Sequence, residues 1–262
     1  MPKPWTLRIC HLYPSLLGVA GDRGNLIAIQ QRCAWRDIGT EVTEVGVETV
    51  PDFSAFDLIL FHGGQDKEMD VAAKDVGDKA ESLRQAVETD VVMLAVCAGY
   101  QLLGHYYQPF IGPRLAGIEA LDLYTVGGAR RFMNHIAIEC DFAGGTRSLV
   151  GFENHSGQTR LGPELQPLGR VIAGGGNNGE DGAEGARYRQ VYATYLHGPV
   201  LPKNPWFTDH LIWQGLRHRY GEIEPLSPLP DGAEERAHEA ALKLALRMKG
   251  KTTALEPTPW RR

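Results

Sequence analysis

A cysteine placed directly after a short apolar run constrains the fold of this chain most. Residues 91–96 are all apolar and include three valines, a pattern that predicts a buried strand. Cys97 follows, then the small residues Ala98 and Gly99, and residues 100–106 predict a helix. A strand, a sharp turn that carries a nucleophile and a helix form a nucleophile elbow. The helix N-terminus favours a thiolate, and the N–H of the next residue can stabilise an oxyanion.

The order of predicted elements in the first half indicates the fold class. The apolar runs predict four strands, and helices are predicted from the loop 13–25 to about Arg36 and over 70–88; the strands are 7–12, 41–47, 56–61 and 91–96. This order predicts a three-layer α/β fold with a mainly parallel sheet. Functional groups then belong at the carboxyl ends of the strands, where both Cys97 and Gly63-Gly64 lie.

The second half predicts a β-rich continuation. Short strands separated by glycine-rich turns are expected at 121–125, 135–140, 169–173 and 190–196. Helices follow at 206–220 and 231–249, joined by a proline-rich linker. We therefore expect one domain over 6–220 and, over 221–262, a C-terminal helical extension that ends in a mobile tail at 250–262.

Composition and charge exclude several classes of function. The chain has 262 residues, a net charge of -5 and a pI near 6.0, which give no electrostatic case for nucleic-acid binding. Its four cysteines are widely spaced and match no zinc pattern, so we expect free thiols and no metal site. No signal peptide, membrane-spanning run or Walker A sequence is present. These features predict a cytoplasmic protein without a stable membrane anchor and with no ATP site of that type.

A nucleophilic thiol needs a base, and one histidine is placed for that role. His197 ends the predicted strand 190–196 and precedes Gly198 and Pro199, so it stands at a strand terminus as Cys97 does. His155, in the segment 151–157, is the competing base. Asp22 is expected to cap the first helix.

These motifs together resemble a known family. Cys97-x-Gly99-x-Gln101 after an apolar strand, with a downstream strand-terminal histidine, is similar to the class I (triad-type) glutamine amidotransferases. The segment 193–199, Ala-Thr-Tyr-Leu-His-Gly-Pro, resembles their cobyric-acid-synthase-like branch. Four further segments narrow the resemblance to the glutaminase subunits of lipid II isoglutaminyl synthases: 21–25, 151–155, 176–181 and 197–205. The resemblance covers about residues 6 to 220.

The resemblance implies a function and a partner. Such a subunit hydrolyses L-glutamine, and the ammonia passes to a MurT-like ligase in a heterodimer. The ligase uses ATP, with Mg²⁺, to amidate D-glutamate in the stem peptide of lipid II during peptidoglycan synthesis. This chain would then need no cofactor of its own. Two alternatives stay open: a glutaminase for a cobyrinate-type amidation, and a non-catalytic scaffold of the same fold.

The resemblance also implies roles for individual residues. Cys97 attacks the side-chain amide of glutamine, and His197 protonates the departing ammonia and then activates water. The N–H of Ala98 and one from Gly63-Gly64, with Gly64 favoured, stabilise the oxyanion. Arg131 fits the place of the arginine that binds the α-carboxylate of glutamine, with Arg130 as its rival. Gln101 is either a substrate contact or simply a helix residue.

Two positions depart from the family pattern. Many relatives have an acid two residues after the histidine, where this chain has Pro199. The histidine must therefore be oriented by another group of this chain, by a carboxylate of the partner, or by nothing, and we expect weak activity without the partner. Ala98 stands where glycine is common in this branch, and the backbone N–H is kept.

Overall fold

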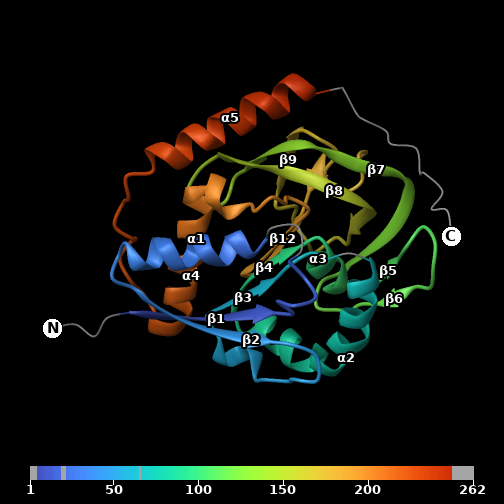
Figure 1. Ribbon diagram of the computed structural model, residues 1–262, viewed down its shortest axis with the longest axis horizontal. Helices are drawn as coiled ribbons and strands as arrows, with labels where there is room; N and C mark the ends of the chain where they lie inside the picture. Colours follow the sequence, from blue (N-terminus) through green and yellow to red (C-terminus); the bar gives the residue numbers. More distant parts are fainter. Residues whose placement is uncertain (1–4, 19–21, 65, 250–262) are drawn as a thin grey trace.

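The computed structural model describes residues 5–18, 22–64 and 66–249, which form two six-stranded sheets covered by helices (Figure 1). The first sheet has the strand order β11-β12-β4-β3-β1-β2. Its strands are β1 (Thr6–Leu12), β2 (Gly39–Val45), β3 (Leu58–Phe61), β4 (Val92–Val96), β11 (Ala186–Tyr188) and β12 (Val191–Thr194). All neighbours pair in parallel except β11 with β12. The predicted mainly parallel sheet is therefore confirmed.

Helices cover both faces of this sheet. On one face α1 (Arg23–Ala34) and α4 (Pro205–Tyr220) share a core with Ile9, Leu60 and Leu94. On the other face α2 (Asp66–Glu88) packs against the alternate residues Cys10, Ile59 and Met93. Because both faces are buried, the strands are continuous apolar runs. The three-layer α/β architecture is confirmed.

The second sheet is mostly antiparallel and is built on one long hairpin. Its strands are β5 (Tyr106–Gln108), β6 (Leu115–Ala116), β7 (Leu123–Cys140), β8 (Arg147–Leu161), β9 (Gly169–Ala173) and β10 (Ala183–Glu184). The predicted strands 121–125 and 135–140 are two parts of β7, joined across an irregularity between Gly127 and Phe132. β8 was not predicted, because its segment 151–157 is rich in glycine and polar residues that are depleted in strands.

The helix after Cys97 is shorter than predicted. Instead of running over 100–106 it is α3 (Ala98–Leu102), and Tyr106 already belongs to β5. The cause is the close approach of β7: a Cβ atom on Gly104 would lie 2.5 Å from the carbonyl oxygen of Leu123. A continued helix would need the space that this strand occupies.

The C-terminal helix lies on the outside of the second sheet (Figure 1). This helix, α5 (Gly232–Met248), agrees with the predicted helix 231–249 and buries Ala245 against Ala137 and Val150. The predicted tail, 250–262, lies outside the described residues, and the boundary at residue 220 stays a prediction. Two short 3₁₀ helices complete the fold, η1 (Phe53–Ala55) and η2 (Leu201–Lys203). In the described ranges no helix combines the length and apolarity that a bilayer crossing requires.

Candidate active site

Cys97 sits on the predicted elbow between β4 and α3. Its backbone has φ 51° and ψ -101°, a conformation that is strained for a residue with a side chain. The turn is tight because α3 begins at once beside the end of β3, where a Cβ atom on Gly99 would lie 2.1 Å from the carbonyl oxygen of Phe61. Only glycine fits there. The strain and the glycine together hold the sulfur at the carboxyl edge of the sheet.

His197 is brought to this cysteine by two sets of backbone pairing. Thr194 of β12 is in register with Val96 of β4, so the residues that follow both strands meet at the same edge. His197 also exchanges backbone hydrogen bonds of 2.8 and 3.1 Å with Phe152 of β8. Its imidazole lies beside Cys97: a Cβ atom on Gly63 would lie 2.9 Å from His197 Cε1 and 3.0 Å from Cys97 Cβ. The structure therefore brings the predicted dyad together.

Asp22 orients this histidine. Its carboxylate Oδ2 lies 3.3 Å from His197 Nδ1, and its side chain is fully buried. The predicted capping role is wrong: Asp22 precedes α1, but its side chain makes no cap hydrogen bond, because the carboxylate is turned to the histidine. The sequence left the source of the third group open, and the structure provides a carboxylate from this chain.

The protonation of this trio follows from its charges. Burial alone lowers the pKa of His197, but the charges of Cys97 and Asp22 and the hydrogen bond to Asp22 outweigh it and raise the pKa to about 10. Burial alone raises the pKa of Asp22, but the hydrogen bond with His197, the charges of His197 and His62, and the Gly63 N–H hold it below its ordinary value. At neutral pH the site therefore contains an imidazolium between a buried carboxylate and the sulfur.

The two glycines after β3 lie against the dyad. A Cβ atom on Gly63 would lie 2.9 Å from His197 Cε1 and 3.0 Å from Cys97 Cβ. The backbone of Gly63 also lies near Asp22 and helps to lower the pKa of that carboxyl group. Gly64, the donor favoured from the sequence, follows it, and Ala98 is the first residue of α3 and is buried. Their roles in binding an oxyanion stay predictions.

The predicted substrate contacts have different surroundings. Arg131 is exposed, and its Nε donates to Asn154 Oδ1 at 2.8 Å. Arg130 instead stacks on Phe132, with its guanidinium 4.8 Å from the ring centre. The Nε2 of Gln101 donates to the Tyr195 hydroxyl at 3.1 Å, so this side chain has a partner inside the protein. The choice between the two arginines, and substrate contact by Gln101, stay predictions.

His155, the competing base, lies in a buried environment that keeps its ring neutral. His155 is buried and stacks on Tyr195 with ring centres 3.7 Å apart, and its Nδ1 bonds to the Gly157 carbonyl oxygen at 2.8 Å. Burial is the main cause that lowers the pKa of His155, to about 3. Its ring is therefore neutral at physiological pH, and the histidine whose pKa responds to the charge of Cys97 is His197.

The buried carboxyl group of Glu184, which the sequence did not predict, holds the end of β12, the strand that precedes His197. Glu184 Oε1 accepts hydrogen bonds of 2.7 Å from the Thr194 hydroxyl and from the Tyr195 N–H. Burial is the main cause that raises the pKa of Glu184 to about 8. The sequence around it shows only a glycine-rich loop, so no local signal marks this contact.

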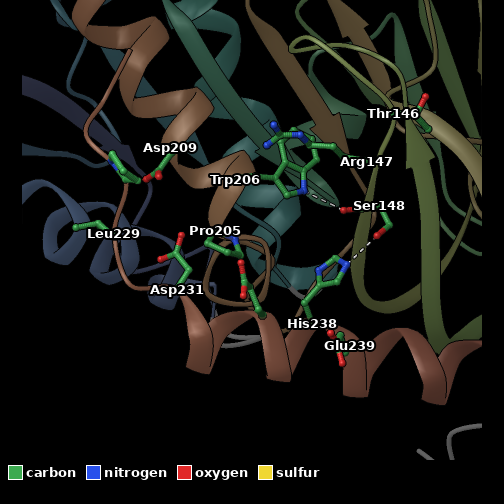
Figure 2. A pocket seen from close by; sticks show the side chains of 12 residues that line it. Thr146, Arg147, Ser148, Pro205, Trp206, Asp209, Leu229, Asp231, His238 and Glu239 are labelled. Atoms are coloured by element: carbon green, nitrogen blue, oxygen red, sulfur yellow. Dashed lines mark hydrogen bonds between the residues drawn. The ribbon is translucent and has the colours of Figure 1, made fainter. Parts of the chain in front are cut away.

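A groove lies away from the dyad, under the N-terminal half of α5 (Figure 2). In this groove Ser148 links Trp206 and His238: its carbonyl oxygen accepts from the indole at 2.9 Å and its hydroxyl bonds to the imidazole at 2.8 Å. None of the predicted site residues lines it. Over the described ranges, no three His, Cys, Asp or Glu side chains gather so as to hold a metal ion.

The fold and the cysteine on its elbow define a class of protein, and comparison with known proteins identifies that class. Residues 8–205 match the CobB/CobQ-like glutamine amidotransferase domain. The chain belongs to this family.

The curated relatives are more specific. The chain is 37% identical over 223 residues to the lipid II isoglutaminyl synthase (glutamine-hydrolyzing) subunit GatD of Streptococcus pneumoniae, a match that covers 84% of each chain. It is 36% identical to the GatD subunit of Staphylococcus aureus, over 93% of this chain and 98% of that one. Cobyric acid synthase of Listeria innocua is 25% identical over 72% of this chain but only 37% of its own length.

Proposed function

We propose that this chain is the glutaminase subunit of a lipid II isoglutaminyl synthase. It hydrolyses L-glutamine to glutamate and ammonia, and a MurT-like ligase uses the ammonia to amidate D-glutamate of the lipid II stem peptide. The proposal rests on one observation above all, the cysteine on a strained elbow beside a histidine that a buried aspartate orients. The names of the two GatD relatives, which match this chain over most of its length, support the assignment of the acceptor.

The first half of the reaction uses Cys97 as the nucleophile and His197 as the proton donor. The Cys97 thiolate attacks the amide carbon of the glutamine side chain, and a tetrahedral intermediate forms with its negative charge on oxygen. The N–H groups of Gly64 and Ala98 are the proposed donors to that oxygen. His197 donates its proton to the departing nitrogen as the carbon–nitrogen bond breaks, so the products are ammonia and a γ-glutamyl thioester.

The second half regenerates the thiolate. Neutral His197 takes a proton from water, the hydroxyl attacks the thioester carbon, and the carbon–sulfur bond breaks to release glutamate. Asp22 keeps the imidazole in one tautomer and stabilises its charged form in both halves. The activity of the isolated chain is therefore not limited by a missing third residue.

The partner supplies the remaining chemistry in this proposal. ATP and Mg²⁺ bind to the ligase, the two chains form a heterodimer in the cytoplasm, and this chain meets lipid II only through the ligase. This division agrees with a chain that carries no Walker A sequence.

The decisive experiment measures glutamate release from L-glutamine by the purified chain, alone and with a MurT-like ligase, and ammonia transfer to lipid II by the complex. Glutamate release that disappears in Cys97→Ala, with an unchanged melting temperature, supports the mechanism. Glutamate release that persists in this variant refutes the mechanism. Glutamate release by the complex without transfer of ammonia to lipid II refutes lipid II as the acceptor.

A further inference from the structure

Lys203 is a half-buried cation with no partner. It belongs to η2, six positions after the catalytic histidine, and its Nζ makes no hydrogen bond or ion pair within the part of the chain that the structure describes. The other buried or half-buried lysines and arginines of that part all bond to a polar side chain: Arg8, Arg32, Arg36, Lys79, Arg84, Arg160, Arg187 and Arg217. Lys203 is the exception among these cations, and its Nζ, which reaches solvent, is free to meet a group from outside the described chain.

The ammonium lies beside the catalytic histidine segment. A Cβ atom on Gly198, the residue directly after His197, would lie 4.0 Å from Lys203 Nζ. Gly198 has φ 93°, so its backbone leaves this side open. His135 is also close, because after burial the Lys203 charge is the second cause that lowers the pKa of this imidazole. No carboxylate among the described residues neutralises the Lys203 charge at this position.

The backbone of Lys203 is held rigidly. Its carbonyl oxygen lies 2.9 Å from the Nδ1 of His238 on α5. On either side, the Leu201 N–H donates to Asn25 at 3.0 Å and the Asn204 side chain donates to Val150 O at 2.9 Å. A lysine that only keeps a surface soluble extends its ammonium into water. Here the backbone is fixed and the side chain is half-buried beside Gly198, and burial lowers the pKa of the ammonium.

We propose that Lys203 binds a carboxylate at the mouth of the Cys97–His197 site. Two sources of that group have the same chemistry: the α-carboxylate of bound glutamine, and an acidic side chain of the ligase docked over the site. A charge-assisted hydrogen bond from an ammonium suits either one. If the carboxylate is that of glutamine, Lys203 acts beside Arg131, the arginine predicted to bind the same group. This inference rests on the proposed glutaminase function.

The test measures binding separately from turnover. In a Cys97→Ala background, which stops the reaction, calorimetry compares the Kd of L-glutamine with and without Lys203→Met. If the ligand is the substrate carboxylate, the Kd rises about 10- to 100-fold, and Lys203→Arg restores most of the affinity. L-glutaminamide, which lacks the carboxylate, should bind equally to both proteins.

The second part of the test measures how tightly the chain binds the ligase. If the carboxylate comes from the ligase, Lys203→Met leaves the Kd of glutamine unchanged and weakens the heterodimer about tenfold or more. Lys243→Met is the matched control, because Lys243 is exposed on α5 and pairs with Glu239. Affinities for glutamine and for the ligase that both stay within twofold overturn the proposal. Since neither arm requires turnover, an inactive parent protein would count against the proposed function alone.

Discussion

Replacing Asp22 with asparagine should move the pH profile of glutamine hydrolysis. The variant keeps the size of the side chain and removes the charge that lies 3.3 Å from His197 Nδ1. A hydrogen bond to a charged group is worth about 1.5–3 kcal/mol, and one pKa unit corresponds to about 1.4 kcal/mol. The pKa of His197, which is raised to about 10, should therefore fall by about 1–2 units.

The sign of the effect follows from the role of the histidine. The imidazolium must donate a proton to the leaving nitrogen, so activity falls as the pH rises through the pKa of His197. In Asp22→Asn this decline should begin about 1–2 pH units lower. Because Asp22 also stabilises the charged imidazole in the transition state, loss of about 1.5–3 kcal/mol there should separately lower kcat about 10- to 150-fold at pH 7.5, where the histidine is still protonated. The same pKa shift is a stability term, because a histidine with a raised pKa stabilises the fold below its unfolded pKa and loses that contribution as the pH rises through its folded pKa.

The assay is the rate of glutamate release from pH 6 to 10.5, with kcat/KM fitted at each pH and melting temperatures recorded in parallel. Asp78→Asn, at an exposed position of α2, is the control and should leave the profile unchanged. A wild-type profile and rate in Asp22→Asn would refute the conclusion that this chain supplies the third catalytic group. That outcome would return the role to the partner or leave the histidine without an orienting acid.

Two further predictions concern the thiol and the elbow. A glutamine-analogue electrophile should label Cys97, as peptide mapping would show, whereas the other cysteines are buried, with pKa values raised by burial, and should stay unlabelled: Cys10, Cys33 and Cys140. Labelling spread over all the thiols would contradict a selectively reactive site. Gly99→Ala should abolish activity and cost about 1–3 kcal/mol in the free energy of unfolding, measured by denaturant titration, because its Cβ meets a backbone oxygen. Gly77→Ala in α2, where the added methyl has open space, should instead stabilise by about 0.5–1 kcal/mol, and equal effects of the two changes would contradict the packing argument.

The sequence predicted the first sheet well because its signals are local. Apolar runs such as 91–96 are buried on both faces, and each ends at a clear turn. Cys97 and His197 were predicted as a pair because both follow such strands. The second sheet was predicted poorly: the polar and glycine-rich residues of β8 resemble a loop until β7 pairs with them.

The missed part of the site depends on contacts between distant segments. Asp22 has the sequence context of a helix cap, and only the folded chain brings it to a histidine 175 positions away. Glu184 is likewise defined by its bond to Thr194 across a turn. Lys203 lies in the recognisable segment 197–205. Its lack of a partner is visible only in the folded chain, where the other half-buried lysines and arginines pair with polar side chains. Such relations have no periodicity, so the pattern of residues does not reveal them.

The backbone bridge between His197 and Phe152 has a consequence for biosynthesis of the protein. Cys97 follows a strand of the first sheet, and His197, the proton donor, is hydrogen-bonded through its backbone to Phe152 of the second sheet. A nascent chain that has formed β4 but not yet docked β8 carries a cysteine without its acid. We therefore expect glutamine hydrolysis to begin only after β8 has docked and this backbone pairing has formed.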